Sequence, residues 1–467
     1  MIDLWTSAEI AEATGGTASA DFAVTGVTFD SREVQAGDLF VAMPGTVHDG
    51  HRFVAGAVSA GAAGALVSHA IDTPHVLVAD VARALEDLGR AARDRSTAKI
   101  IGVTGSVGKT STKEAIYAAL DRFCPGCVHR SVKSYNNHTG VPLSLARMPR
   151  DARYAVFEMG MNNPGEIAAL TRMVRPHVAL ITAIAPAHIE NLGSEEAIAD
   201  AKGEIFQGLE PLPGGEEGGL AIIPNDTPHR DRLVKAARRH ARRIITFGGG
   251  DADIHAIHAV RSNGGGSLIT ASLIDCDLTF TIAQRGDHWV TNSLAAVAAV
   301  EAVGADVAVA GLALADMGGL KGRGERHQVQ LDGGELLLID ESYNANPASM
   351  AATLGSLGSE LGVERRIAVL GPMRELGGHS AALHAGLAPA VIAARIDRLI
   401  LIGEEMRPLA TSIAGKVGID HVANVEEAMA ALSAIVRPGD AVLVKASNSV
   451  GLAKLVERMV RGQSCST

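Results

Sequence analysis

Short apolar runs alternate with amphipathic segments along most of this chain, and their spacing predicts an α/β protein. From Ile100 onward, each run is followed by a stretch with the periodicity of a helix and then by another run. This alternation is typical of a mainly parallel sheet that is covered by helices. The strands predicted in this part are Ile100–Val103, Ala155–Phe157, Val178–Ile184, Ala221–Ile223 and Ile244–Phe247.

Two further regions flank this segment, which predicts three domains in all. Residues 1–96 combine Ala/Gly-rich helical segments with the short β-like runs Val24–Phe29, Asp38–Ala42, Ala65–Val67 and Val76–Ala79. After the glycine-rich segment Gly318–Gly324, helices separate the strands Glu335–Ile339, Arg366–Leu370, Leu399–Ile402 and Ala441–Val444, which indicates a smaller Rossmann-like domain. We therefore expect an N-terminal domain at 1–96, a central parallel-sheet domain at 97–322 and a C-terminal Rossmann-like domain at 323–467.

Composition argues against several classes of partner. The 467 residues carry a net charge of −10 and only 3% aromatic residues, so no nucleic acid partner is expected, and no obligate protein partner is indicated. The basic run Lys235–Arg243 is interpreted as one face of a solvated helix. The N-terminus lacks a long apolar core, and segments such as His288–Val300 are too short and polar to cross a bilayer. This favours a cytoplasmic protein without membrane insertion.

The four cysteines are scattered, which suits a reducing compartment. Cys124 and Cys127 form a Cys-x-x-Cys pair with Pro-Gly between them, but no second pair or histidine stands at zinc spacing. We therefore interpret this pair as a turn that ends a helix, and not as a redox or metal site.

The segment Ile100–Ser111 predicts a phosphate-binding loop. An apolar strand runs into a glycine-rich turn and then into a helix, whose start carries Lys109 and two hydroxyl groups. Backbone N–H groups, a helix N-terminus and an ammonium directed at one point suit a nucleotide polyphosphate, and a hydroxyl is left for Mg²⁺. The spacing is unusual, because a standard loop has glycine where this chain has Val103. The loop residues expected to bind the nucleotide are Thr104, Gly105, Ser106, Val107, Gly108, Lys109, Thr110 and Ser111.

Polar residues follow other predicted strands of the same sheet. Glu158 comes directly after the strand at 154–157, and His188 follows the apolar run 178–185. Ligands of open α/β sheets collect beyond the carboxyl ends of the strands, so both side chains are expected near the phosphate loop, as direct or water-mediated contacts of Mg²⁺. A satisfied rim carboxylate and a capping or packed histidine are the alternatives. Asn136 and Asn137 are candidates for the same rim or for caps of the next helix.

Charged residues near the start of the C-terminal region are further candidates. Asp340 stands at the end of the strand 335–339, where an acid can bind a ribose hydroxyl. Arg323 and Arg326 lie in the connector GRGER, and arginine binds phosphates through two parallel hydrogen bonds. A contact that closes two domains over a ligand and a plain surface charge cluster both fit these arginines.

Together these motifs resemble one family, the Mur ligases, which form amide bonds at the expense of ATP in peptidoglycan synthesis. The family's version of the phosphate loop matches Gly102-x-Thr104-Gly105-Ser106-x-Gly108-Lys109-Thr110 and explains the unusual spacing. The resemblance covers essentially the whole chain, including Asp30–Arg32, Gly37–Phe40, Asn136–Pro142, Phe157–Gly160, His188–Lys202, Gly322–Arg326 and the block 340–347. It implies an N-terminal UDP-sugar-binding domain, a central P-loop ATPase domain and a C-terminal Rossmann-like ligase domain, with ATP and Mg²⁺ as cofactors.

The block Asp340–Pro347 looks like that of the members that join D-alanyl-D-alanine to UDP-N-acetylmuramoyl-tripeptide. Members that add diaminopimelate or lysine to UDP-N-acetylmuramoyl-dipeptide carry a different, histidine-containing block, and the former also have an Asn-Pro-Arg motif, which this chain lacks. Folylpolyglutamate synthetase shares the loop but lacks the Asp-Ser-Arg region. The resemblance implies that ATP converts the substrate carboxylate to an acyl phosphate, which the dipeptide amine attacks. Another ligase of the family, or a nucleotide-binding scaffold without chemistry, is the alternative.

The resemblance also implies roles for single residues. Lys109 would contact the β- and γ-phosphates and Thr110 one Mg²⁺, while Glu158 and His188 would hold a second Mg²⁺. Lys202 matches a lysine that is carbamylated in relatives, which turns a cation into a metal-binding anion; without that match it reads as a solvated helix lysine. The other matches are Asn292 on the adenine side, Arg326 and Asp340 on the nucleotide, Ser31, Arg32, Asp49, Gly50 and His51 at the uridine diphosphate end, and Asn136, Asn137, Asn344 and Asn346 around the substrates. Pro372 and Lys445–Asn448 depart from the family pattern.

Overall fold

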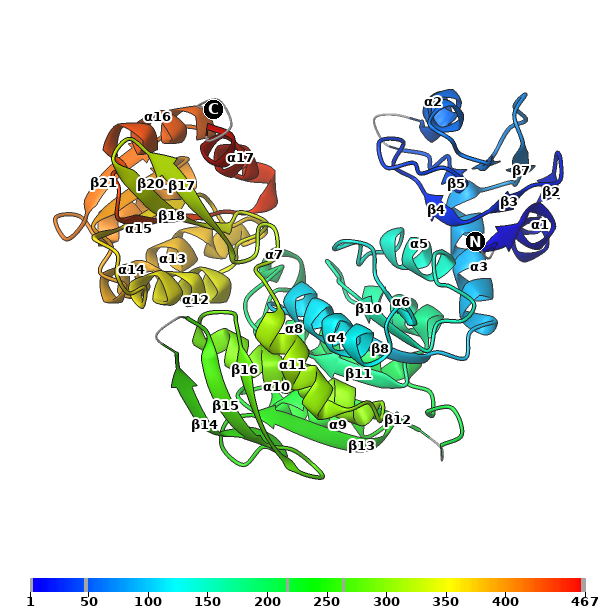
Figure 1. Ribbon diagram of the computed structural model, residues 1–467, viewed down its shortest axis with the longest axis horizontal. Coiled ribbons are helices and arrows are strands. Elements are labelled where there is room, and N and C mark those ends of the chain that lie inside the picture. The colour runs from blue at the N-terminus through cyan, green and yellow to red at the C-terminus, as the bar shows by residue number, and fades with distance from the viewer. Residues whose placement is uncertain (1–2, 46–48, 216–217, 263–264, 463–467) are drawn as a thin grey trace.

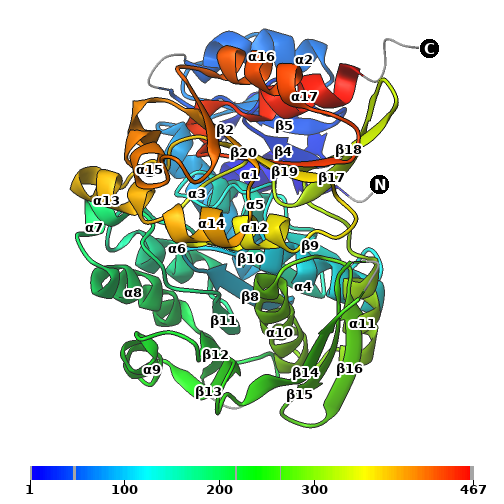
Figure 2. The same ribbon diagram turned by 90° about the vertical axis from the view of Figure 1, so that its left-hand side faces the viewer.

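The computed structural model describes residues 3–45, 49–215, 218–262 and 265–462, which form three α/β units in chain order (Figure 1). The N-terminal and C-terminal units stand at opposite ends of the central unit and on the same side of it. The view turned by 90° shows the central sheet below both (Figure 2).

The N-terminal unit is built on a small sheet in the order β2-β7-β6-β5-β4, parallel except for β2, with β1 and β3 paired beside it. Its first helix begins at a capping box, in which the hydroxyl of Thr6 accepts the N–H of Glu9 and the carboxylate of Glu9 accepts the N–H of Thr6. The elements are β1 (Trp5–Thr6), α1 (Ser7–Thr14), β2 (Thr17–Ala18), β3 (Ala23–Val24), β4 (Gly26–Thr28), β5 (Asp38–Val41), α2 (Val54–Ser59), β6 (Gly64–Val67), β7 (His75–Leu77) and α3 (Val81–Asp94).

The central unit holds a nine-stranded sheet in the order β16-β15-β14-β13-β12-β11-β8-β10-β9. It is parallel from β9 to β14, and β15 and β16 continue it antiparallel. Its strands are β8 (Lys99–Thr104), β9 (Val128–Arg130), β10 (Tyr154–Glu158), β11 (Val178–Ile181), β12 (Gly219–Pro224), β13 (Ala241–Gly248), β14 (Ile254–Arg261), β15 (Ser267–Ser272) and β16 (Asp277–Ile282). Its helices are α4 (Lys109–Phe123), α5 (Gly140–Ala146), α6 (Glu166–Val174), α7 (Ile189–Leu192), α8 (Glu195–Gly203), α9 (Arg230–Ala237), α10 (Asp287–Ala302) and α11 (Val307–Asp316).

Helices cover both faces of this sheet, which is why its inner strands read as continuous apolar runs. Ile101 and Val103 of β8 belong to one apolar cluster with residues of α4, α10 and α11. Ile100 belongs to the cluster on the other face, with residues of α5, α6, α8 and α9. With its side chains buried on both faces, β8 is a rigid base for the loop that follows it.

The C-terminal unit is a six-stranded sheet in the order β17-β18-β22-β19-β20-β21, parallel except for β17. Apolar clusters on its two faces include residues of α12 and α15 on one side and of α16 and α17 on the other. The strands are β17 (Glu325–Leu331), β18 (Gly334–Glu341), β19 (Arg365–Leu370), β20 (Arg398–Ile402), β21 (Gly418–Val422) and β22 (Asp440–Lys445). The helices are α12 (Pro347–Gly358), α13 (Ser380–Ala385), α14 (Ala388–Ala393), α15 (Arg407–Ser412), α16 (Val425–Ile435) and α17 (Ala453–Arg461).

The predicted fold class is confirmed, and each strand predicted for the sheets of the central and C-terminal units is present. We propose domain limits near 96/97 and 322/323, because each sheet lies within one of the resulting stretches. The prediction for Lys235–Arg243 is wrong: α9 ends at Ala237, and β13 begins at Ala241. The prediction also omitted β14, β15 and β16, in which exposed positions interrupt the apolar pattern. No described helix is long and apolar enough to cross a membrane.

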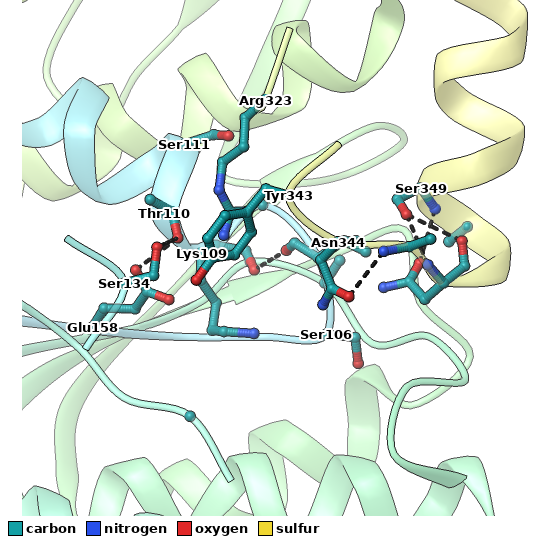
Figure 3. Close-up of a pocket in the computed structure, with 18 of the residues that line it drawn as sticks. Ser106, Lys109, Thr110, Ser111, Ser134, Glu158, Arg323, Tyr343, Asn344 and Ser349 are labelled. Carbon is teal, nitrogen blue, oxygen red and sulfur yellow. Dashed lines mark hydrogen bonds between the residues drawn. The ribbon is translucent and has the colours of Figure 1, made fainter. Parts of the chain in front are cut away.

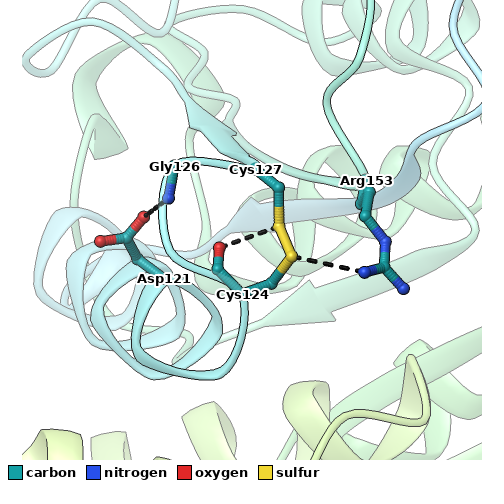
Figure 4. The surroundings of a disulfide bond; sticks show 5 residues. All are labelled: Asp121, Cys124, Gly126, Cys127 and Arg153. Atoms are coloured by element: carbon teal, nitrogen blue, oxygen red, sulfur yellow. Dashed lines mark hydrogen bonds between the residues drawn. A yellow bond between two sulfur atoms is a disulfide. The ribbon is translucent and has the colours of Figure 1, made fainter.

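A disulfide joins Cys124 and Cys127 just beyond α4 (Figure 4). The predicted helix-ending turn is present, since Cys124 caps α4 and its carbonyl accepts the N–H of Cys127 at 3.2 Å. Pro125 and Gly126, whose φ is 75°, suit a type II turn, which brings the two Cα atoms within 5.7 Å. The interpretation of this pair as a plain turn is therefore corrected: the turn places the two sulfur atoms together.

His177 makes the stability of the central unit depend on pH. Its Nδ1 accepts the N–H of Ile100 in β8 at 2.8 Å, and burial, with the nearby charges of Arg93 and Arg175, lowers its pKa from 6.5 to about 4. The unfolded chain therefore binds a proton at a higher pH than the folded chain, so stability falls as pH falls from 6.5 towards 4. We expect a loss of about 2 kcal/mol at about pH 5 from this residue alone.

Urea unfolding of the wild type and of His177→Asn at about pH 7.5 and about pH 5 measures this contribution. Asparagine keeps an acceptor close to the position of Nδ1 and does not titrate. The pH dependence should be weaker in the variant by the stated amount, whereas equal slopes for the two proteins would contradict the assignment.

Candidate active site

A cavity of about 550 Å³ lies where the carboxyl ends of the central strands meet the C-terminal unit (Figure 3). Its walls come from the loop between β8 and α4, the ends of β10 and β11, the first turns of α10, and the C-terminal segment from β18 into α12. The carboxyl ends of parallel strands are the usual ligand position in open α/β sheets. The topology therefore brings segments that are far apart in the sequence to one site.

Two glycines shape the loop, and a third belongs to the strand. A Cβ on Gly105, whose φ is 150°, would lie 1.9 Å from the hydroxyl of Thr182. A Cβ on Gly108, whose φ is 84°, would lie 2.8 Å from Oδ1 of Asn292. Gly102 lies inside β8, where a Cβ would lie 2.6 Å from Cε of Met159. The unusual spacing thus has a physical reason, since Gly102 serves strand packing and only the later two serve the loop.

Lys109 begins α4 and faces the cavity. Its Nζ donates to the carbonyl of Gly105 at 2.7 Å. Desolvation lowers the pKa of Lys109, as does the charge of Arg323, while Glu158 opposes the shift. The ammonium, the helix N-terminus and Arg323 together make this end of the cavity suited to an anion.

Glu158 is the buried centre of a polar cluster beside Lys109. Its carboxylate accepts hydrogen bonds from Oγ1 of Thr110 at 2.8 Å and from Nδ2 of Asn136 at 2.7 Å. Nζ of the buried Lys113 lies 3.9 Å from the same carboxylate. These contacts hold a carboxylate and a hydroxyl next to each other, and such oxygen donors are the ligands that Mg²⁺ prefers.

Of the other two predicted metal-site residues, His188 lines the cavity and Lys202 lies buried outside it. His188 lines the cavity with a left-handed backbone (φ 60°), and its Nδ1 lies 2.5 Å from the carboxylate of Glu375 in the C-terminal unit. This contact lowers the pKa of Glu375. Lys202 on α8 is 1% exposed and does not line the cavity. Burial, together with the charge of Lys109, lowers the pKa of Lys202 well below its usual value. The alternative interpretation of Lys202 as a solvated helix lysine is therefore wrong.

Helices α10 and α12 supply further walls of the cavity. Asn292 on α10 lines the cavity, as do His288 and Trp289 at the start of the same helix. Asn346 caps α12 by accepting the N–H of Ser349 at 2.9 Å. The carbonyl of Asn344 accepts a hydrogen bond from Nζ of Lys445 at 2.9 Å.

The guanidinium of Arg323 lies over the ring of Tyr343, 4.0 Å from its centre, and Figure 3 shows both side chains among those that line the cavity. This stacking fixes Arg323 at the cavity, whereas the sequence offered Arg323 and Arg326 equally. Arg326 points elsewhere and forms a bidentate pair with Glu360. Asp340 is 2% exposed, and its carboxylate accepts the N–H groups of Gly322 at 3.1 Å and Ser342 at 3.0 Å. Neither Arg326 nor Asp340 lines the cavity.

Some of the remaining predicted loop and rim residues line the cavity, and others do not. Ser106, Val107 and Ser111 line the cavity, while Thr104 and Gly105 lie behind its wall. The hydroxyl of Thr104 is buried without a hydrogen-bond partner among the described residues. Asn137 lines the cavity and also accepts the N–H of Gly140 at the start of α5, so the site and capping interpretations hold together.

The residues predicted for the uridine diphosphate end lie in the N-terminal unit and do not line the cavity. Arg32 pairs with Asp30 and holds the pKa of that carboxyl at about 2. Nδ1 of His51 lies 2.7 Å from the carboxylate of Asp49, and its Nε2 accepts the N–H of Ser68 at 2.9 Å. At Gly50, between these two residues, a Cβ would lie 2.5 Å from the carbonyl of Met43. Ser31 is partly exposed.

Residues 133–135 connect the N-terminal unit to the cavity. Lys133 forms an ion pair with Glu33, and the ring of Tyr135 lies 5.4 Å from that of Phe29. Ser134 between them lines the cavity, with its hydroxyl 3.4 Å from that of Thr110. A ligand that spans these segments would therefore contact the central loop as it leaves the N-terminal unit.

Sequence reasoning missed several cavity residues. Those without an assigned role include Ser134, His288, Trp289, Glu341, Tyr343 and Lys445. Their neighbours in the sequence were assigned, so adjacency to Asn292 and Asn344 was an available signal. Lys445 had a signal of its own, since it is the last residue of a strand that is buried along its length. Burial lowers its pKa, which marks an unusual position for a lysine.

The fold and the loop define a P-loop α/β protein, and comparison with known proteins identifies its family. Three family models match in chain order: the Mur ligase family catalytic domain at residues 23–118, the Mur ligase middle domain at 103–300, and the Mur ligase, glutamate ligase domain at 322–448. The chain belongs to the Mur ligase family.

Similar proteins match along nearly the whole chain. The UDP-N-acetylmuramoyl-tripeptide–D-alanyl-D-alanine ligase of Synechocystis sp. is 35% identical, with 95% of this chain and 93% of the relative covered. A crystal structure of MurF from Acinetobacter baumannii has a TM-score of 0.83 at 29% identity, covering 98% and 99% of the two chains. MurF ligase from Thermotoga maritima, in complex with ADP, has a TM-score of 0.75 at 26% identity, covering 94% and 98%.

Proposed function

We propose that this chain is the ATP-dependent ligase that joins D-alanyl-D-alanine to UDP-N-acetylmuramoyl-tripeptide in peptidoglycan precursor synthesis. One observation carries the proposal: the phosphate loop and the block around Asn344 and Asn346 form walls of the same cavity. The loop is suited to a nucleotide, and the block resembles that of the dipeptide-adding members. The name of the Synechocystis relative supports the same reaction.

The reaction needs an activated carboxylate, because a carboxylate oxygen is a poor leaving group. In the first step the γ-phosphoryl group passes to a carboxylate oxygen of the tripeptide, with cleavage of the P–O bond to ADP. In the second step the dipeptide amine forms the C–N bond, the C–O bond to phosphate breaks, and the nitrogen loses a proton. Both steps gather negative charge on phosphate oxygens, so positioning and cations carry most of the catalysis.

The residues of the cavity fit these needs. Lys109 belongs to the central unit and Arg323 to the start of the C-terminal unit, and they would neutralise the phosphates from both units. Asn292, beside Gly108, would lie on the adenine side. The N-terminal residues Ser31, Arg32, Asp49, Gly50 and His51 would bind the uridine diphosphate end of the substrate, at a distance from the reacting carboxylate.

The donor set also fits Mg²⁺. Thr110 and Glu158 present adjacent oxygen atoms, and His188 lies in the same wall. When bound, Mg²⁺ supplies charge neutralisation at the transferred phosphoryl group. Lys202 as an ammonium would oppose a cation at this place, whereas its carbamate would support one. Asp340 and Arg326 would join the nucleotide only after a movement of the C-terminal unit, because neither lines the cavity here.

Phosphate release from ATP tests the proposal. The purified protein is offered each candidate carboxylate, namely UDP-N-acetylmuramoyl-tripeptide, UDP-N-acetylmuramoyl-dipeptide and folate, with each candidate amine, namely D-alanyl-D-alanine, diaminopimelate, lysine and glutamate. We expect release that requires the tripeptide and D-alanyl-D-alanine together. Release only with the dipeptide or folate would assign another ligase of the family, and no release with any pair would favour a scaffold without chemistry.

A further inference from the structure

Three side chains that can bind a metal ion meet on one face of the hairpin that opens the C-terminal unit. Glu325 and His327 lie two residues apart on β17, so their side chains share a face, and Asp340 on β18 is the direct cross-strand partner of Glu325. One ligand atom from each residue lies within 4.8 Å of the other two. Among the described residues, no other group of three histidine, cysteine, aspartate or glutamate side chains has this spacing.

The distance between two of these ligand atoms is close to that of two ligands on one ion. Nε2 of His327 lies 3.7 Å from the carboxylate of Glu325. In zinc sites the nitrogen and oxygen ligands lie about 2.1 Å from the ion, so two ligands at a tetrahedral angle are about 3.4 Å apart. A small side-chain movement would therefore place both atoms on the same ion.

His327 presents a buried nitrogen to this group. Its Nε2 is buried and has no hydrogen-bond partner among the described residues, although most buried side-chain polar atoms have one. Backbone and side-chain groups of the hairpin thus leave this nitrogen free to bind something else. A cation placed between His327 and Glu325 would satisfy the nitrogen and the carboxylate at once.

The two carboxylates favour a cation at the same place. Glu325 and Asp340 stand directly opposite each other on neighbouring strands, where like charges destabilise a sheet. Asp340 is buried, and each of its oxygens accepts a single N–H, from Gly322 or Ser342, so each oxygen keeps a further lone pair. The side chain of Glu325 is 35% exposed, which gives an ion access from solvent.

We propose that Glu325, His327 and Asp340 bind a divalent transition-metal ion of the Zn²⁺ type. An imidazole nitrogen with two carboxylates suits Zn²⁺, whereas Mg²⁺ and Ca²⁺ take oxygen ligands. Three protein ligands leave a fourth position for water. The ion would join β17, which is the edge strand of the six-stranded sheet, to β18.

This site is distinct from the phosphate-loop cavity, which none of its three residues lines. Asp340 would leave it if the aspartate joined a nucleotide, so the test contains no nucleotide. Glu325 and His327 have no role in the proposed reaction, and they are therefore the residues to change.

Zn²⁺ binding to the full chain tests the proposal. Protein freed of metal by a chelator is titrated with Zn²⁺ in a calorimeter, and Co²⁺ in place of Zn²⁺ reports a four-coordinate site by its visible absorption. Loss of an outer partner of a metal ligand already costs about 10- to 100-fold in affinity, so His327→Gln and Glu325→Gln should each weaken the site by about 10²-fold or more. Zn²⁺ should also raise the unfolding temperature of the wild type more than that of either variant.

His229→Gln is the matched control. Nε2 of His229 also lies close to a carboxylate, 3.5 Å from that of Glu195, but the pair belongs to no group of three such ligands among the described residues. This variant should bind Zn²⁺ as the wild type does.

Equal stoichiometry and affinity for Zn²⁺ in the wild type, His327→Gln and Glu325→Gln would overturn the proposal and leave a plain ion pair between His327 and Glu325. Two variants are used so that a folding defect in one, seen in the unfolding curve without metal, does not decide the result. The titration needs neither ATP nor the two substrates, so a failure of this inference is distinct from a failure of the proposed function.

Discussion

Lys109→Ala is expected to lower kcat/KM of the ligase by about 10³-fold or more. Nζ of Lys109 is held by the carbonyl of Gly105 at the N-terminus of α4, so the ammonium is already placed where phosphate charge would develop. Alanine removes that charge and leaves the loop glycines in place. The defect should appear in kcat as well as in the KM for ATP, because the γ-phosphoryl group gains charge on the way to the transition state.

Initial rates of phosphate release with both substrates, together with a thermal unfolding curve, measure this effect. Lys235→Ala is the matched control, since Lys235 is an exposed lysine on α9 that does not line the cavity. The control should retain wild-type rates, and both variants should unfold near the wild-type temperature. Turnover of Lys109→Ala within a few-fold of the wild type would overturn the assignment of the phosphate loop.

Lys202→Ala is expected to lower kcat by about 10²-fold or more, and short carboxylates should restore part of the loss. The side chain is fully buried, and its lowered pKa favours the neutral amine, which is the form that attacks CO₂. That step forms an N–C bond and releases a proton, and the resulting carbamate is an anion near the charge of Lys109. A buried anion at this position fits the charge balance of the cavity better than a second ammonium does.

Rescue by a small carboxylate requires the space that opens when Lys202 is replaced by alanine. Formate or acetate should raise the rate of Lys202→Ala in a saturable manner, whereas Lys202→Met, which fills the same volume with an apolar chain, should not respond. Chloride at the same ionic strength controls for salt. Rescue of neither variant would argue against a carbamate at Lys202, and equal rescue of both would place the carboxylate effect elsewhere.

Much of the fold was predictable because its information is local. The strands around Ile100 and Ala155 are apolar on both faces, and such runs are recognisable without knowledge of their partners. The outer strand β14 was not, because most of its side chains face solvent and its identity depends on pairing with β13 and β15. The same limit explains why Lys235–Arg243 was taken for one helix, since the change from α9 to β13 comes from the neighbouring strand β12.

In the candidate site, too, some residues were predictable from local sequence, and others depended on contacts with distant segments. Glu158 was found because it ends a buried strand, and His188 because it lies in the segment that follows the next one, β11. That rule needs only the order of elements. Tyr343 was missed and Arg323 was not distinguished from Arg326, because their roles depend on contacts across the cavity. Lys202 reads as an ordinary helix lysine in the sequence, and only the packing around α8 makes it a buried amine.

By itself, the sequence determined the family, the three sheets and the phosphate loop, because apolar periodicity and glycine positions act over a few residues. Only the tertiary structure decided that Gly102 serves strand packing, that Cys124 and Cys127 meet, and that Arg326 is paired with Glu360 instead of facing the cavity. Each of these depends on atoms that approach within a few ångströms from other segments. Burial and charge at such contacts are properties of the folded chain, and no local pattern records them.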